Sequence, residues 1–175
     1  MASRRDFLTA FKKPLESVKQ KEDLIVRPPY GFSESLFQSE CVACEDKACV
    51  ASCEEEIIVI RAGGTPMLNF SKKGCTFCEA CAEACAPNVL ALENQHTSEQ
   101  INARFIISTE ACVAHNDVIC FSCKEPCIDD AILFNGMWNP VIDMNLCTGC
   151  GFCQSRCPTN AISYTGIEIN QKEAI

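Results

Sequence analysis

Residues 147–158 read CTGCGFCQSRCP, and the spacing of the cysteines in this stretch decides what the chain can form. Its first three cysteines recur at every third residue, so one tight loop can bring their thiolates together. A cubane [4Fe–4S] cluster offers iron corners close to one another, and a small residue such as Gly149 lets the backbone approach it. The fourth, Cys157, lies before Pro158 and is expected to point from a first helical turn toward a neighbouring cluster. The stretch therefore predicts a cluster-binding loop.

Three similar runs precede this one, and the first cysteines of the four runs are spaced by 34, 37 and 35 residues. Run two, Cys75–Cys85, repeats the C-x2-C-x2-C-x3-C spacing of bacterial ferredoxins. Run one, Cys41–Cys53, has C-x4-C at its second interval, and run three, Cys112–Cys127, has C-x7-C at its first. Extra residues can loop out without moving the thiolates. We therefore predict three to four [4Fe–4S] clusters, with run three the one that could stay empty.

All sixteen cysteines are candidate iron ligands, and the fourth of each run is expected to complete the site of another run. The gaps of 21 residues between runs one and two and 19 between three and four are shorter than the 26 between two and three. Short gaps favour pairing adjacent runs, although pairing run one with four and two with three is possible. The predicted sites are site I (Cys41, Cys44, Cys49, Cys85), site II (Cys75, Cys78, Cys81, Cys53), site III (Cys112, Cys120, Cys123, Cys157) and site IV (Cys147, Cys150, Cys153, Cys127).

Disulfides and zinc are the alternatives for so many cysteines. Sixteen cysteines among 175 residues approach the content of disulfide-rich secreted proteins, but no secretory signal accompanies them. A zinc site combines two C-x2-C pairs separated by a longer stretch, which these runs do not offer. Since the 47% apolar content includes the cysteines, the aliphatic core is thin, and we expect cluster loss to unfold the chain. A further possibility is that the clusters serve only to stabilise a small fold and have no other role.

The segments between the runs predict short strands. Residues 57–60 and 67–70 form a first hairpin and residues 131–134 and 141–143 a third, both around glycine-containing turns. A second, longer hairpin is expected from residues 89–92 and 104–108. The predicted fold is α+β: tandem ferredoxin-like modules built from four repeats of about 35 residues. The modules are expected at residues 33–95 and 96–175.

Residues 1–32 are expected to form an N-terminal arm. Arg4 and Arg5 match the opening of a twin-arginine export signal, but lysines and acidic residues follow where such a signal needs an apolar run. The arm should therefore stay uncleaved and the protein cytoplasmic, with a helix over residues 6–12. Residues 27–31, RPPYG, are interpreted as a linker because consecutive prolines break helices.

Charge and motifs exclude several functions. A net charge of −8 argues against nucleic-acid binding, which relies on lysine and arginine. No segment approaches the roughly 20 apolar residues of a membrane span. Neither a phosphate-binding loop nor a nucleophile with a placed base is present, so no enzymatic activity is predicted. The acidic surface would suit a basic face of a redox partner, or serve solubility alone.

A few other residues could tune the sites. His115, inside run three, could replace a thiolate as in Rieske-type centres, or be an ordinary loop histidine. Trp138 could mark a docking surface, although packing against its own hairpin is the simpler interpretation. Three aromatic residues within the cysteine loops are expected to shield clusters from water: Phe77, Phe121 and Phe152.

Several of these features together resemble the NapF family, ferredoxin-type accessory proteins of the periplasmic nitrate reductase system. They are the SRRxFL opening at residues 3–8, residues 27–30, runs one, two and four, and the ACVAH of run three. The C-x4-C of run one departs from the family's C-x2-C. The resemblance implies a cytoplasmic protein that acts in maturation, by cluster assembly or reduction, of the catalytic subunit of periplasmic nitrate reductase before export. The alternative is an electron-transfer subunit between a quinol-linked complex and a molybdoenzyme.

Overall fold

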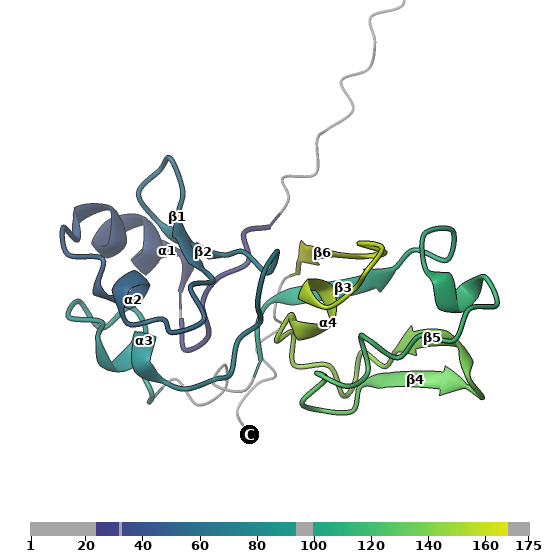
Figure 1. Ribbon diagram of the computed structural model, residues 1–175. Helices are drawn as coiled ribbons and strands as arrows, with labels where there is room; N and C mark the ends of the chain where they lie inside the picture. The colour runs from purple at the N-terminus through teal and green to yellow at the C-terminus, as the bar shows by residue number, and fades with distance from the viewer. Residues whose placement is uncertain (1–23, 32, 94–99, 168–175) are drawn as a thin grey trace, which may run out of the picture.

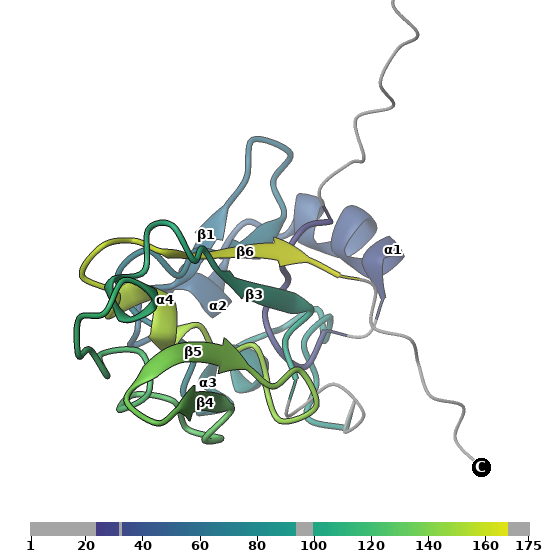
Figure 2. The same ribbon diagram turned by 90° about the vertical axis from the view of Figure 1, so that its right-hand side faces the viewer.

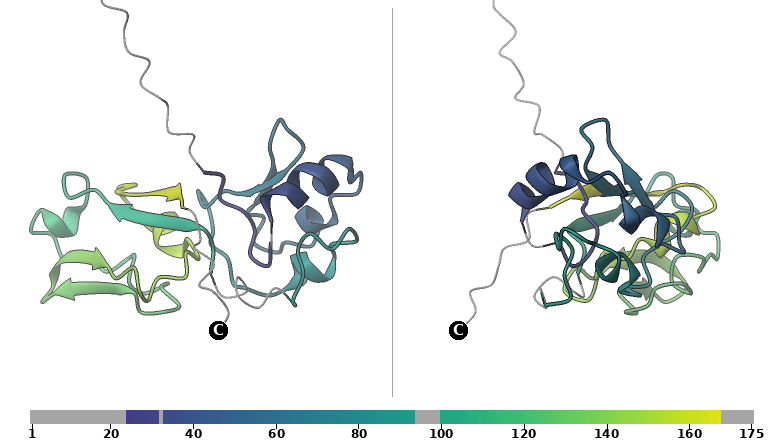
Figure 3. Two further views of the ribbon diagram at one scale, coloured as in Figure 1. Left: turned by 180° about the vertical axis from the view of Figure 1, so that it is seen from behind. Right: turned by 90° about the vertical axis from the view of Figure 1, so that its left-hand side faces the viewer.

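The computed structural model describes residues 24–31, 33–93 and 100–167. Short helices and three two-stranded antiparallel sheets form two lobes that lie side by side, an N-terminal lobe of residues 33–93 and a C-terminal lobe of residues 100–167 (Figure 1). The view from behind in Figure 3 shows the same arrangement. This mixture agrees with the predicted α+β class, while the four-repeat plan stays a prediction. Within the described residues, no helix has the length and apolarity that crossing a membrane requires.

The N-terminal lobe is built on one hairpin and several single helical turns. The hairpin confirms the first predicted one, with Ile58 opposite Leu68 and both side chains buried. Its elements are α1 (Glu34–Leu36), which continues into the π-helical turn η2 (Phe37–Cys41), then α2 (Ala48–Ala51), β1 (Ile58–Ile60), β2 (Pro66–Leu68) and α3 (Ala80–Glu83). The helices are short because the cysteine loops begin and end within a few residues of them.

The C-terminal lobe has two strand pairs, with β3 and β6 lying together above β4 and β5 in the view of Figure 2. The β4–β5 hairpin confirms the third predicted one and turns at Gly136, whose φ of +67° favours glycine. The elements are β3 (Ala103–Ile107), the 3₁₀ turn η3 (Val113–His115), β4 (Ile132–Asn135), β5 (Trp138–Ile142), α4 (Phe152–Ser155) and β6 (Ile162–Gly166).

The second predicted hairpin is wrong. Strand β3 pairs with β6, the last strand of its own lobe, so that Ala103 lies opposite Gly166. Leu90, expected in the other arm of that hairpin, forms an isolated antiparallel bridge with Gly31. In each lobe, then, the segment that enters the lobe pairs with the segment that leaves it: Gly31 with Leu90, and β3 with β6. The alternation of apolar residues could predict the strands but not these distant partners.

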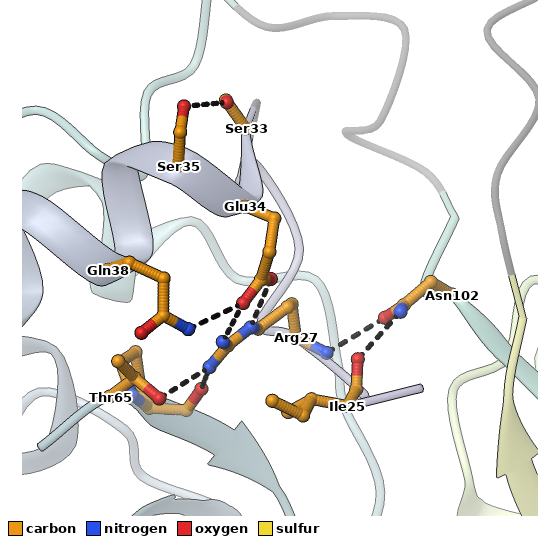
Figure 4. Close-up of polar contacts among 9 residues, drawn as sticks. Ile25, Arg27, Ser33, Glu34, Ser35, Gln38, Thr65 and Asn102 are labelled. Carbon is orange, nitrogen blue, oxygen red and sulfur yellow. Dashed lines mark hydrogen bonds and ion pairs between the residues drawn. The ribbon is translucent and has the colours of Figure 1, made fainter. Parts of the chain in front are cut away.

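The linker interpretation of residues 27–31 is also wrong, because this segment is buried. The N–H of Leu68 donates to the carbonyl oxygen of Val26 at 2.9 Å, which adds the segment to the edge of the first hairpin. The Arg27 guanidinium donates to Thr65 Oγ1 at 3.0 Å, to a Pro66 carbonyl and to the Glu34 carboxylate (Figure 4). The extended backbone that two prolines impose serves here as a packed strand-like edge. The predicted helix over residues 6–12 and the export-like opening lie outside the described residues.

The two lobes share one apolar core. Phe70 of the N-terminal lobe contacts the rings of Phe105 and Tyr164 in the other lobe, with centroids 5.5 and 5.1 Å apart. Asn102 joins the lobes again, since it accepts from the Arg27 N–H and donates to the Ile25 carbonyl, each at 2.8 Å (Figure 4). These contacts hold the cysteine loops of the two lobes close together.

Candidate iron–sulfur centres

All sixteen cysteines lie in the described ranges and are free thiols, so the disulfide alternative finds no support. Only Cys78 is exposed; the others are buried or half-buried. They gather into four groups, and each group takes three cysteines from one run and one from its neighbour. These are the groups predicted as sites I to IV, although iron ligation by them stays a prediction.

Site II surrounds a hollow lined by Cys75, Cys78 and Cys81 of run two together with Cys53 of run one. Its other walls include the apolar Ile58 and Leu68, with the carboxylates of Glu55 and Glu79 beside them. The loop curls around the hollow through left-handed backbone at Phe77 and Glu79, with φ of +56° and +67°. The Phe77 N–H lies 3.4 Å from Cys75 Sγ and donates to it. Such a bond favours the charged form of a thiolate ligand.

Tyr30 completes the wall of site II, which the sequence did not suggest. Its hydroxyl donates to the Phe77 carbonyl oxygen at 3.0 Å, and its side chain is buried beside the cysteine loop. Burial, followed by the charge of Glu79, raises the pKa of Tyr30 to about 12, so the phenol stays neutral. The only available signal was an aromatic residue next to two prolines, which indicates a turn as readily as a packed wall.

Site IV surrounds a hollow lined by Cys147, Cys150 and Cys153 of run four together with Cys127 of run three. Glycine is needed twice in this loop: Gly149 and Gly151 have φ of +79° and +86°. Backbone N–H groups of Gly149 and Phe152 donate to the first two sulfurs and lower their pKa, against a larger rise caused by burial. The loop thus offers donors to negatively charged sulfur in a buried pocket that is lined mainly by apolar residues and also by Asp129.

Site III surrounds a hollow lined by Cys112, Cys120 and Cys123 of run three together with Cys157 of run four. The Ala161 N–H donates to Cys157 Sγ at 3.2 Å. The long C-x7-C interval forms the turn η3 and a loop, which the Asn116 amide ties to the carbonyl oxygens of Cys112 and Thr109 at 2.9 and 3.1 Å. The extra residues therefore loop out while the four thiols stay together.

His115 does not join this group of thiols. Its Nε2 lies 3.0 Å from the carbonyl oxygen of Pro140, so the ring is held by the neighbouring strand β5. This contact favours the ordinary loop histidine over a Rieske-type ligand.

Site I combines Cys41, Cys44 and Cys49 of run one with Cys85 of run two, and its members are recognised by their mutual electrostatic effects. Burial, followed by the nearby Cys85 and Cys49 thiols, raises the pKa of Cys41 to about 11. The Leu90 N–H donates to Cys85 Sγ at 3.4 Å. The two extra residues of this run are accommodated by a turn at Lys47, whose φ is +46° and whose ammonium donates to the Cys41 carbonyl. Insertion in the loop has again left the thiols together.

The loop aromatics take different positions. Phe77 lines site II, as expected of a shielding residue. Phe121 packs on Phe134 with ring centroids 4.8 Å apart, and Phe152 faces Gly74 of the other lobe. Trp138 is partly exposed in β5, and its docking role stays a prediction.

The donor set fits a [4Fe–4S] cluster. Burial raises the pKa of Cys75 and Cys81 to about 12 and that of Cys153 still further, so these thiols would stay protonated unless a metal replaced the proton. Within residues 24–31, 33–93 and 100–167, no three histidine, cysteine or acidic side chains lie close enough together to bind a single metal ion. Four thiols spread around a hollow suit a cubane cluster better than zinc.

Comparison with known proteins also indicates that the chain binds [4Fe–4S] clusters. A family model described as a 4Fe-4S binding domain matches residues 140–163. The chain is 37% identical over 142 residues to the ferredoxin-type protein NapF of Escherichia coli K12, covering 79% of this chain and 83% of that protein. Identity to the ferredoxin-type protein NapF of Haemophilus influenzae is 30% over 176 residues, 96% of each chain. It is 27% over 167 residues, 85% of this chain and 69% of the relative, for the methylamine utilization ferredoxin-type protein MauM of Methylobacillus flagellatus. On this similarity, the chain belongs to the NapF family of ferredoxin-type iron–sulfur proteins.

Proposed function

We propose that this protein is a cytoplasmic, non-enzymatic accessory factor that matures the catalytic subunit of periplasmic nitrate reductase before that subunit is exported. Maturation here means assembling or reducing the iron–sulfur cluster of the catalytic subunit. The observation that carries the proposal is the gathering of sixteen free thiols into four groups of four in a chain of the NapF family. Such a chain can hold iron, sulfide and electrons, which are what cluster maturation requires.

All sixteen cysteines are proposed to bind four [4Fe–4S] clusters, grouped as sites I to IV. The cross-over of the fourth cysteine between adjacent runs is supported by the hollows at sites II, III and IV and by the electrostatic coupling of Cys41 with Cys85. We further propose two ferredoxin-like modules, residues 33–95 and 96–175, after an arm of residues 1–32. The burial of residues 27–31 favours assigning the end of that arm to the first module.

The proposed partner is the catalytic subunit in its cytoplasmic, unexported form. Support comes from the relatives, which include the ferredoxin-type proteins NapF and NapG of Escherichia coli. The net charge of −8 is suited to an encounter with a basic face. Nucleic acid is not a proposed partner, and no membrane span is proposed for this chain.

Anaerobic affinity capture of the tagged protein from nitrate-respiring cells tests this function. We expect recovery of a molybdoenzyme subunit that still carries its twin-arginine signal, with iron bound to the captured chain. A matched capture with Cys150→Ala and Cys75→Ala, which disables sites II and IV, should show whether binding needs the loaded protein. Periplasmic recovery of the full-length protein would contradict the proposal.

The second candidate is a dedicated electron-transfer subunit. The close approach of the two lobes at their cysteine loops favours it, because short separations between clusters speed electron transfer. Quinol-linked membranes would then reduce the protein rapidly and reversibly, and affinity capture would recover quinol-oxidising subunits instead of an unexported catalytic subunit.

A further inference from the structure

The loops of runs two and four are in direct backbone contact. The Cys75 N–H donates to the Cys150 carbonyl oxygen at 2.7 Å. Beside this bond, a Cβ placed on Gly74 would lie 2.7 Å from the same Cys150 oxygen, so the two backbones approach closely. Gly151 meets Phe70 in the same way, since a Cβ there would overlap the phenylalanine ring. Sites II and IV are therefore neighbours across the contact between the lobes.

Within each lobe the two sites are also neighbours. Helix α2 contacts α3, and these helices carry Cys49 of site I and Cys81 of site II. In the C-terminal lobe, Cys153 of site IV lies in helix α4, and Cys157 of site III follows it by four residues, directly after that helix. Each lobe thus holds one site beside the contact between the lobes and one farther from it.

We propose that the four cluster sites form a single line in the order I, II, IV, III, with the Cys75–Cys150 backbone hydrogen bond as its central joint. The order in space differs from the order in the chain. An electron that leaves one cluster oxidises it and reduces the next in the line, and no atom or proton has to move with it. Because the proposal concerns only the internal order of the sites, it holds whichever partner the protein serves.

The line has the two irregular runs at its ends. Helix α2 of run one lies in the N-terminal lobe, and the β4–β5 hairpin beside run three lies at the far side of the C-terminal lobe (Figure 1). The regular runs two and four occupy the middle. Electrons should therefore enter or leave through sites I and III, whereas sites II and IV connect them.

Blocking an inner site and blocking an end site should give different magnetic behaviour. Cys78→Ala and Cys120→Ala each remove the second cysteine of a run, disabling inner site II or end site III. Both variants should keep about 12 iron atoms per chain, three clusters of four. In fully reduced Cys120→Ala, electron paramagnetic resonance should show all three remaining clusters broadened by spin–spin interaction. In Cys78→Ala, the cluster at site I should give a narrow, isolated signal.

The opposite pattern would overturn the proposal: an isolated signal in Cys120→Ala, or none in Cys78→Ala. If either variant fails to fold, a second pair of variants, which disables the other inner site and the other end site, makes the same test. Cys147→Ala disables inner site IV and should isolate site III, whereas Cys44→Ala disables end site I and should leave an unbroken line of three interacting clusters. The comparison needs no partner protein, so its result is independent of the proposed role in maturation.

Discussion

Runs two and four keep the regular cysteine spacing, whereas runs one and three tolerate insertions, and the structure gives a physical reason for the difference. The regular runs meet between the lobes at the start of run two and the middle of run four, where Gly74 and Gly151 leave no room for an added side chain. The irregular loops face outward: Val42 in run one is 52% exposed, and Ile119 in run three is 57% exposed. Packing between loops, more than ligation of iron, therefore restricts the spacing.

Exchanging loop lengths tests this comparison with the largest expected effect. Inserting Glu-Asp after Gly151 lengthens run four to the C-x4-C of run one, and should remove the site IV cluster and weaken the contact between the lobes. Deleting Glu45 and Asp46 shortens run one to C-x2-C and should leave iron binding intact. Iron content after anaerobic reconstitution should fall by about four atoms or more per chain for the insertion only. Equal iron loss in both variants would refute the comparison.

Gly151→Ala tests the close approach of the inner loops. The new methyl group would overlap Phe70, and the φ of +86° strains any residue other than glycine. We expect a loss of about 3 kcal/mol, or roughly 6–12 °C in Tm, for a chain of this size.

Gly136→Ala is the matched control, because its φ is +67° but nothing lies within 4 Å of the new Cβ. It should cost only the backbone strain, about 1 kcal/mol. Thermal melting under anaerobic conditions at a fixed scan rate compares the two. Equal shifts in Tm would mean that packing between the inner loops adds nothing.

Arg27→Ala should destabilise the N-terminal lobe without changing a residue of the regular or the irregular cysteine loops. The guanidinium is buried, bonds Thr65 and Pro66, and lies 4.6 Å from the centre of the Phe37 ring. Removing it leaves buried oxygens unpaired, at a cost of about 2 kcal/mol. Iron content should be unchanged, and iron loss would show that this segment supports site I or II directly.

Glu34→Gln is the milder partner of that variant. The hydrogen bond from Arg27 lowers the pKa of Glu34 below its ordinary value of 4.5. The carboxylate therefore contributes stability that is present above pH 4.5 and is lost as the pH falls through the lowered value. The difference in Tm between wild type and Glu34→Gln should be constant from neutral pH down to this range and then shrink. A difference that grows in acid would contradict the assignment.

His115→Ala should have the smallest effect, although the residue lies inside an irregular run. Loss of its hydrogen bond to the Pro140 carbonyl should cost about 1 kcal/mol, with no loss of iron. A missing cluster or a changed resonance spectrum would restore the Rieske-type alternative.

The parts of this fold that could be predicted from sequence are those determined by nearby residues. Cysteine spacing indicates the cluster loops, and the turn at Gly136 indicates its hairpin, because each depends on a few consecutive residues. The pairing of β3 with β6 and the burial of Arg27 depend on partners far along the chain, and proline-rich composition resembles that of a linker. Likewise, the groups of cysteines followed from a known pattern of cluster ligation, but the contact of Cys75 with Cys150 is visible only in three dimensions.

Iron and acid-labile sulfide per chain, measured on anaerobically reconstituted wild-type protein together with its Mössbauer spectrum, test the central claim most directly. If the irregular runs bind clusters as the regular ones do, the protein should hold about 16 iron atoms, four for each of four sites. A value of about 8, with the spectrum of two clusters only, would show that runs one and three have lost their sites.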